Sequence, residues 1–232
     1  MSWNQPSTIA AGADVRITSF LSNVYGWMFL GLLVTAGTAF VVASSPLLVQ
    51  TFIVNRLLFW ILLFGQLGLV FYLAARVEKT SPVTAATLFM IYSVSVGITS
   101  SVVLLAYTGA SVFGTFMVTA GMFGALAIFG TFTKRSLAGV GQFAMMGLIG
   151  LIIAMIVGLF WQNDALQFVI SIVGVIVFTG LTAWDAQRLK HMAVSLPDGR
   201  IGSYAVVGAL SLYLDFINLF FFLLRFLGGR RD

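Results

Sequence analysis

Two aspartates lie in segments that are otherwise apolar enough to enter a lipid bilayer. Asp185 belongs to GLTAWDAQRLK and Asp215 to SLYLDFINLFFFLLRF. An ionised side chain at the bilayer centre costs at least about 2.5–3.5 kcal/mol, so each carboxylate is expected to face protein and to find a partner. Burial and a second nearby carboxylate both favour the protonated form. The two could therefore share a proton near neutral pH as one titrating unit, or bind a hard cation such as Ca²⁺ when deprotonated.

One cation and one amide are candidates to complete this set. Arg76 ends an apolar segment, and the span count below places it on the same side of the membrane as both aspartates. An arginine favours the charged form of a carboxylate, so an aspartate freed by loss of the shared proton could pair with Arg76 and act as a switch. Asn218, three residues after Asp215, shares its helical face and is a candidate accessory group.

A purely structural interpretation of the same residues stays open. Asp215 could hydrogen-bond nearby tyrosine or asparagine groups and hold helices together, while Asp185 could lie at the membrane interface beside Arg188. Asn218 fits either interpretation.

The composition indicates what kind of chain must position these groups. Of 232 residues, 60% are hydrophobic and only 8% charged, with a mean hydropathy of +1.06, whereas soluble domains carry about 25% charged residues. This composition predicts a polytopic membrane protein. The net charge of +5 comes without a basic cluster interleaved with aromatics, so we expect no nucleic-acid partner. The absence of cysteine excludes disulfides and thiolate chemistry, and no hydrolase, metalloprotease or phosphate-loop motif indicates an enzyme.

The charged residues divide the chain into segments long enough to span a membrane, which takes roughly 20 mostly apolar residues. The uncharged stretch between Thr80 and Thr133 is too long for one helix, and AYTGAS (106–111) divides it. We predict an all-α protein with an N-terminal arm over 1–22, without a removable signal peptide, and one seven-helix transmembrane domain over 23–232. The seven predicted spans are 24–43, 57–75, 83–105, 112–132, 138–161, 165–187 and 204–227.

Basic residues predict the orientation of these spans, because cytoplasmic loops are enriched in lysine and arginine. With seven spans, eight basic residues lie on the side of the N-terminus and four on the other, which favours a cytoplasmic N-terminus. The basic tail GGRRD argues against an outside C-terminus. A six-span topology with a re-entrant last segment remains the alternative.

Small residues recur every four positions in two predicted spans. Gly150, Ala154 and Gly158 form one such row, and Gly121 and Ala125 form another. Rows of this kind let a neighbouring helix approach closely, so we expect close helix contacts at these positions.

The chain resembles the Bax inhibitor family, also called the transmembrane BAX inhibitor motif proteins, and particularly its bacterial branch. The resemblance extends from NVYGWMFLGLLVTA (23–36) over nearly the whole chain. Its most specific stretches are GVIVFTGLTAWDAQRLK (174–190) and GALSLYLDFINLFFFLLRF (208–226), with TAATLFMIYSVSVGITSS (84–101) and TAGMFGALAIFGTFTKRSL (119–137) in support.

The resemblance implies a seven-helix fold in which the C-terminal helix is central and the other six surround it. It also implies a pH-sensitive calcium leak controlled by an aspartate pair on the last two helices, which matches Asp185 and Asp215, and an arginine partner that matches Arg76. The loop over 191–203 is longer than in some bacterial relatives.

These observations together predict a Ca²⁺ leak channel in a bacterial inner membrane, gated by protonation of Asp185 and Asp215. The expected partners are the lipid bilayer and Ca²⁺ as the transported ion, with no cofactor. A non-conducting regulator that binds another membrane protein is the alternative, and an intramembrane enzyme lacks a catalytic set.

Overall fold

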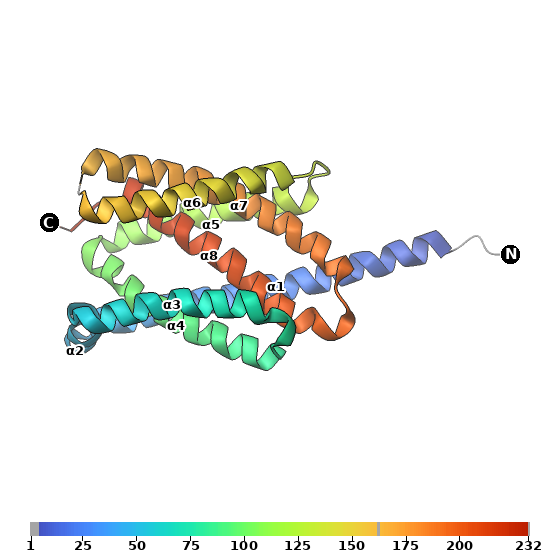
Figure 1. The fold of residues 1–232 in the computed structure, drawn as a ribbon, viewed down its shortest axis with the longest axis horizontal. Coiled ribbons are helices and arrows are strands. Elements are labelled where there is room, and N and C mark those ends of the chain that lie inside the picture. Colours follow the sequence, from blue (N-terminus) through green and yellow to red (C-terminus); the bar gives the residue numbers. More distant parts are fainter. Residues whose placement is uncertain (1–4, 162, 232) are drawn as a thin grey trace. The chain divides into compact units, whose positions relative to one another are not determined.

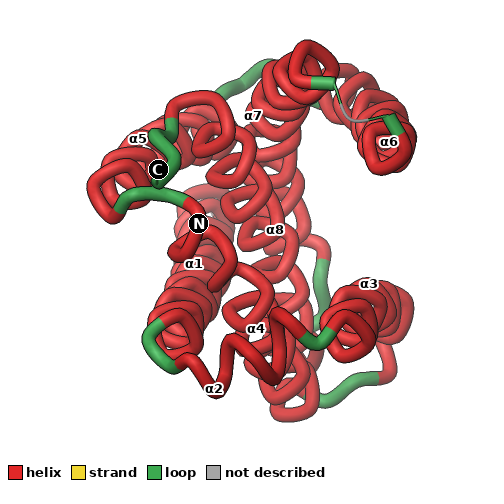
Figure 2. The backbone as a smooth tube through the Cα atoms, turned by 90° about the vertical axis from the view of Figure 1, so that its left-hand side faces the viewer, coloured by secondary structure: helices red, strands yellow, loops and turns green. Residues whose placement is uncertain are grey.

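The computed structural model describes residues 5–161 and 163–231. Long helices joined by short connections make up this part of the chain (Figures 1 and 2), and its only β-type pairing is an isolated bridge between Tyr107 and Arg230. In chain order the helices are α1 (Gln5–Ala43), α2 (Pro46–Val49), the π-helix η1 (Gln50–Val54), α3 (Arg56–Arg76), the 3₁₀ helix η2 (Val77–Lys79), α4 (Pro82–Ala106), α5 (Gly109–Phe132), α6 (Ala138–Phe160), α7 (Asp164–Ser195), the 3₁₀ helix η3 (Asp198–Arg200) and α8 (Ile201–Leu227).

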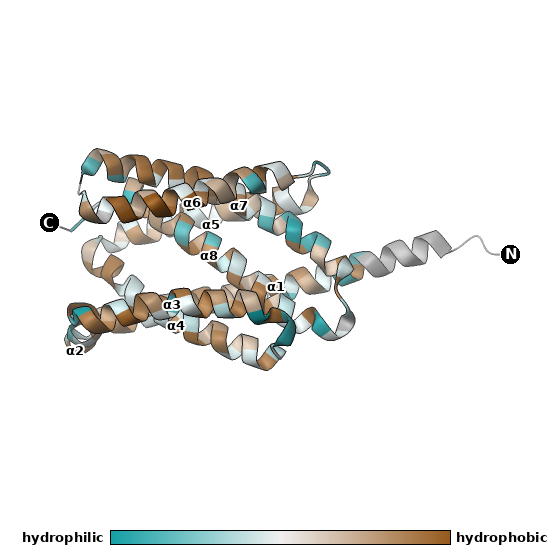
Figure 3. Ribbon diagram, in the orientation of Figure 1, coloured by the Kyte–Doolittle hydropathy of each residue, from teal (hydrophilic) through white to brown (hydrophobic). Residues whose placement is uncertain are grey.

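Seven of these helices, α1 and α3 to α8, are long and apolar enough to cross a membrane. The prediction of an all-α polytopic protein with seven spans is thereby confirmed. Figure 3 shows the hydrophobic colouring along these helices and hydrophilic residues mostly at their ends and in the connections. In lipid every backbone polar group must be satisfied internally, which is why apolar segments of this length form helices.

Side-chain caps and prolines explain several helix boundaries. The Thr108 hydroxyl accepts from the Ser111 amide and begins α5, which divides the long uncharged stretch near the predicted turn. The Asn55 side chain caps α3 in the same way, and Pro46 stands at the start of α2 directly after the first span. Such caps satisfy amides that the first helical turn leaves unpaired.

Several boundaries differ from the sequence prediction, and those of α1, α7 and α8 change the assignment of an arm and a loop. Helix α1 begins at Gln5 and passes through the predicted arm. Helix α7 continues to Ser195 and α8 begins at Ile201, so most of the predicted loop 191–203 is helical. The segment 188–195 has no glycine or proline to stop a helix, and Pro197 supplies the first strong break. The division into an arm and one domain stays a prediction.

The chain forms two compact units that are described separately. Unit 1 comprises the chain up to Val102 together with Leu189–Ser211, and unit 2 comprises Val103–Arg188 together with the chain from Leu212. Unit 1 therefore holds α1 to α3, most of α4, the end of α7 and the start of α8. Unit 2 holds α5, α6 and the longer parts of α7 and α8.

In unit 1, small residues let α1 and α4 pack closely. A Cβ added at Gly97 would lie 2.6 Å from the Thr38 Cβ and 2.7 Å from the Thr35 carbonyl oxygen. The Thr35 hydroxyl also donates to the Ser93 carbonyl at 3.0 Å. Helix α3 is the least buried span, at 6% of its apolar window, and it is tied to α4 by the side chain of Gln66.

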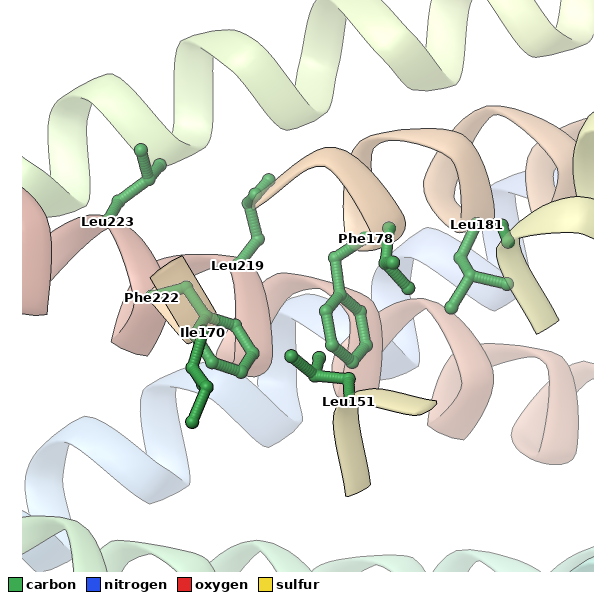
Figure 4. Close-up of a cluster of buried hydrophobic side chains, with 9 residues drawn as sticks. Leu151, Ile170, Phe178, Leu181, Leu219, Phe222 and Leu223 are labelled. Atoms are coloured by element: carbon green, nitrogen blue, oxygen red, sulfur yellow. The ribbon is translucent and has the colours of Figure 1, made fainter. Parts of the chain in front are cut away.

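In unit 2, α7 contacts α5, α6 and α8 at glycines. A Cβ at Gly130 on α5 would overlap the Ala183 carbonyl of α7, and one at Gly141 on α6 would overlap the Trp184 ring. On α7 itself, a Cβ at Gly174 would lie 2.6 Å from the Phe222 ring of α8. Figure 4 shows the hydrophobic core of this unit. In it, Phe178 and Phe222 stack with their ring centres 5.8 Å apart. The cluster consists of Ala144, Leu151, Ile170, Val177, Phe178, Leu181, Leu219, Phe222 and Leu223.

The predicted rows of small residues are only partly correct. A Cβ at Gly150 or Gly121 would meet no atom of the described chain within 4 Å, so the predicted close contact is wrong at both positions. A Cβ added at Gly158, in contrast, would lie 2.9 Å from the side-chain amide nitrogen of Gln167. Spacing alone identifies a row of small residues, but helix rotation decides whether that row faces protein.

Candidate functional site

Asp185 lies on α7 within unit 2 and is buried, with 8% of its surface exposed. Its Oδ1 atom is 3.7 Å from a guanidinium nitrogen of Arg188, one helical turn further along. That distance is an ion pair without a hydrogen bond, and Oδ1 has no hydrogen-bond partner within the described residues. The helix extends ten residues beyond Asp185, about 15 Å along its axis.

Asp215 lies on α8, also in unit 2, and only 4% of it is exposed. Its Oδ2 atom is buried and has no hydrogen-bond partner within residues 5–161 and 163–231. The next residue, Phe216, packs edge-to-face against Phe116 and Phe123 of α5, each with ring centres 5.5 Å apart. These contacts fix the local orientation of α8.

Asp185 and Asp215 are the two buried carboxylates of unit 2 among the described residues. Each also keeps one buried oxygen without a hydrogen bond in the described chain. A buried carboxylate without full hydrogen bonding is costly when ionised, so this arrangement favours uptake of a positive species between α7 and α8. A proton or a metal cation would serve.

Two carboxylates supply only part of the coordination of Ca²⁺, which takes six to eight oxygen ligands. Among the described residues, no three acidic or histidine side chains come together in a way that could hold a metal ion. Coordination of Ca²⁺ at Asp185 and Asp215 would therefore need further oxygen ligands from backbone groups or water.

Asn218 uses part of its hydrogen-bonding capacity within its own helix. Its amide nitrogen donates to the Leu214 carbonyl at 2.8 Å. The accessory role predicted for Asn218 would accordingly use its amide oxygen, and that role stays a prediction.

Arg76 is exposed at the end of α3, in unit 1. Its predicted pairing with an aspartate stays a prediction, because the aspartates belong to unit 2. The cation observed beside Asp185 is Arg188. Its spacing of three residues after Asp185 is a recognisable sequence signal for a side-chain pair.

Gln187 is a buried polar residue that the sequence did not single out. Its Oε1 accepts from the Leu137 amide at 2.8 Å, and its Nε2 donates to the Arg135 carbonyl at 2.9 Å. Both partners are backbone atoms of the connection between α5 and α6, so no side-chain pattern in the sequence could have identified them.

Comparison with known proteins identifies the family of the chain. The family described as inhibitor of apoptosis-promoting Bax1 matches residues 17–232. The chain belongs to the Bax inhibitor family. The family resemblance found in the sequence is thereby confirmed.

Bacterial relatives of this Bax inhibitor family protein match it over most of its length. It is 43% identical to the inner membrane protein YbhL of Escherichia coli over 218 residues, which cover 93% of each chain. It is 41% identical over 215 residues to an uncharacterized protein of Borreliella burgdorferi, covering 92% of this chain and 93% of the relative. It is 36% identical over 222 residues to the uncharacterized protein YrjE of Lactococcus lactis, covering 93% and 94%. This is a multi-pass integral membrane protein.

Proposed function

We propose that this protein is a pH-sensitive cation leak channel, with Ca²⁺ as the transported ion, gated by Asp185 and Asp215. The observation that supports the proposal is that Asp185 on α7 and Asp215 on α8 are both buried, each with an oxygen that has no hydrogen-bond partner in the described chain. Two such groups in an apolar span are costly unless a proton or cation joins them.

Gating follows from the two charge states of the pair. With one proton shared, the carboxylates can hold α7 and α8 together. When that proton leaves, the two negative charges repel each other, and Asp185 can pair fully with a cation. Arg188 is in place on the same helix, and Arg76 is a second proposed partner. Deprotonated oxygens can then bind Ca²⁺ as it passes.

The membrane setting of this proposal is the bacterial inner membrane, with the N-terminus in the cytoplasm. The relationship to an inner membrane protein of E. coli supports the location. The excess of basic residues on the predicted N-terminal side supports the orientation.

The test is Ca²⁺ flux in proteoliposomes across a series of pH values. The protein is expected to pass Ca²⁺ above the rate of empty liposomes, and that rate should change with pH. Asp185→Asn and Asp215→Asn should each flatten the pH dependence, because an amide cannot exchange the proton. Asp164→Asn is the matched control, since Asp164 lies exposed at the start of the same helix as Asp185, and it should behave like wild type.

Two outcomes would count against the proposal. If no condition gives flux above empty liposomes, a non-conducting membrane regulator that binds another membrane protein becomes the better explanation. If flux occurs but both asparagine variants keep the wild-type pH profile, the aspartate pair is not the gate.

A further inference from the structure

The connection between α5 and α6, residues 133–137, is held rigidly against α7 within unit 2. Gln187 is 6% exposed, and its side chain forms hydrogen bonds with two backbone groups of this connection, the Leu137 amide and the Arg135 carbonyl. The Thr133 hydroxyl accepts from the Arg135 amide at 3.3 Å, and the Ser136 hydroxyl accepts from the Ala138 amide at 3.3 Å. A connection with this many backbone restraints presents its side chains in a defined arrangement.

The side chains that this connection presents to its surroundings are basic. Lys134 and Arg135 are both exposed. Arg188 follows Gln187 in the chain. Because Gln187 donates a hydrogen bond to the Arg135 carbonyl, Arg188 lies at the same end of unit 2 as this connection. Arg188 has 51% of its side chain exposed. We call Lys134, Arg135 and Arg188 the basic cradle.

Trp184 fixes the position of the third cation. The guanidinium of Arg188 lies over the Trp184 ring, 5.4 Å from its centre. The ring itself packs against the backbone of α6 at Gly141, where a Cβ would overlap it. A guanidinium held over an aromatic face is pre-organised to bind a phosphate with two parallel hydrogen bonds.

The positive charge of the cradle is largely uncompensated by the described acidic side chains of unit 2. Of the described acidic residues in unit 2, Asp185 is the one that contacts the cradle, through its ion pair with Arg188, and it is buried. Asp164 lies 24 residues before Arg188 on the same helix, about 36 Å away along its axis. Asp215 lies buried on α8.

The depth of the cradle matches the headgroup layer of a bilayer. The hydrocarbon core is about 30 Å thick, and α7 rises about 36 Å between Asp164 and Arg188. Tryptophan together with arginine or lysine at a span end is typical of the membrane interface. A phosphate carried by a lipid would therefore be presented at the level of these cations.

We propose that the basic cradle is a binding site for the phosphate headgroup of an anionic phospholipid. The lipid phosphate would bind the Arg188 guanidinium and the positive charges of Lys134 and Arg135, while Gln187 and Trp184 act as positioning residues. This site does not require that the protein conducts ions, and its Arg188 is at the same time the ion-pair partner of Asp185. It differs from diffuse attraction of a basic loop to a charged membrane, because it requires the geometry that Gln187 imposes.

The test is native mass spectrometry of the full-length protein in detergent, titrated with phosphatidylglycerol or phosphatidylcholine. Wild type should prefer phosphatidylglycerol. The double variant Lys134→Gln/Arg135→Gln should lower phosphatidylglycerol affinity about tenfold or more, since each basic residue near an anionic headgroup is worth about 1 kcal/mol. Arg230→Gln/Arg231→Gln removes the same number of charges from the C-terminal tail and should leave the affinity unchanged.

Two further variants separate a built site from diffuse charge. Gln187→Leu keeps every charge but releases the connection, and should lower phosphatidylglycerol affinity about threefold to tenfold. Arg188→Lys keeps the charge of an exposed residue, so folding is preserved, but loses the planar guanidinium over Trp184 and should weaken binding in the same direction.

Four results would overturn the proposal. The first is no preference for phosphatidylglycerol in wild type. The second is an equal loss in the matched tail variant, and the third is wild-type affinity in folded Gln187→Leu and Arg188→Lys, because diffuse charge would then suffice. The fourth is displacement of the lipid by inorganic phosphate at the same concentration, which would indicate a site for free phosphate.

Discussion

Two polar regions within membrane spans, Gln66 in unit 1 and the aspartates in unit 2, differ in whether their hydrogen bonds are satisfied. In unit 1, Gln66 on α3 is neutral and satisfied, because its amide nitrogen lies 3.0 Å from both the Ser95 carbonyl and the Ser95 hydroxyl and 3.2 Å from the Thr99 hydroxyl. In unit 2, Asp185 and Asp215 can carry charge, and each has a buried oxygen without a hydrogen bond in the described residues.

This difference separates a group that holds helices together from one that can respond to its surroundings. A satisfied amide between two helices contributes packing energy that does not depend on pH. An incompletely satisfied carboxylate changes its energy whenever a proton or cation arrives or leaves. Because an ionisable group in a membrane span raises the free energy of the folded protein, such groups typically mark functional sites.

Among the variants considered, Asp215→Asn should have the largest effect on stability and should remove the difference between the two regions. An ionised, buried carboxylate is destabilising, so the variant should be more stable than wild type at alkaline pH, by about 2–3 kcal/mol. At acidic pH, where the carboxyl is neutral, the difference should vanish. Thermal unfolding in detergent over a pH series measures this, with the exposed Asp164→Asn as control. A stability difference that stays the same at every pH would contradict the explanation.

Gln66→Leu should have a smaller effect in the opposite direction. It removes the polar link between α3 and α4, and hydrogen bonds between spans are worth about 0.6–1.7 kcal/mol, so the variant should be less stable by about that amount at every pH. The same unfolding experiment checks this, and Gln50→Leu, at an exposed position in η1, should change little. A strong pH dependence of the loss would show that the Gln66 cluster is not the neutral link described here.

Thr99→Val should have the smallest effect. It removes one of the partners of Gln66 while keeping the side-chain shape, so a loss of about 0.5 kcal/mol is expected. In a double-mutant cycle, Thr99→Val should cost almost nothing once Gln66 is leucine, because the shared hydrogen bond has gone. Additive losses would indicate that Thr99 stabilises α4 through its own backbone bond to Val96 instead.

The spans themselves were predictable because each depends on its own residues. The apolar segment 57–75 and the observed α3 differ by one residue at each end, and 138–161 differs from α6 by one. The errors occurred where the chain leaves the apolar region, as at the end of α7, where polar but helix-compatible residues extend the helix to Ser195. A hydropathy argument cannot detect such an extension.

The candidate site was predictable only in part. Charges within apolar segments are rare, so Asp185 and Asp215 stand out directly from the sequence. The role of Gln187 does not, because its partners are backbone atoms fifty and fifty-two residues away. The glycines behave similarly. Gly150 belongs to a regular row, but a Cβ added there would meet no neighbour within 4 Å, whereas Gly130 and Gly141 accommodate α7.

The sequence by itself determined that this is a seven-span helical protein of the Bax inhibitor family with two aspartates in its last two spans. It could do so because the bilayer requires long apolar helices whatever their neighbours are. Only the tertiary structure decided which polar groups are satisfied from another part of the chain: Gln66 by α4 and Gln187 by the connection between α5 and α6. The physical reason is that hydrogen bonds and ion pairs act over a few ångströms, so helix rotation and packing determine which atoms meet.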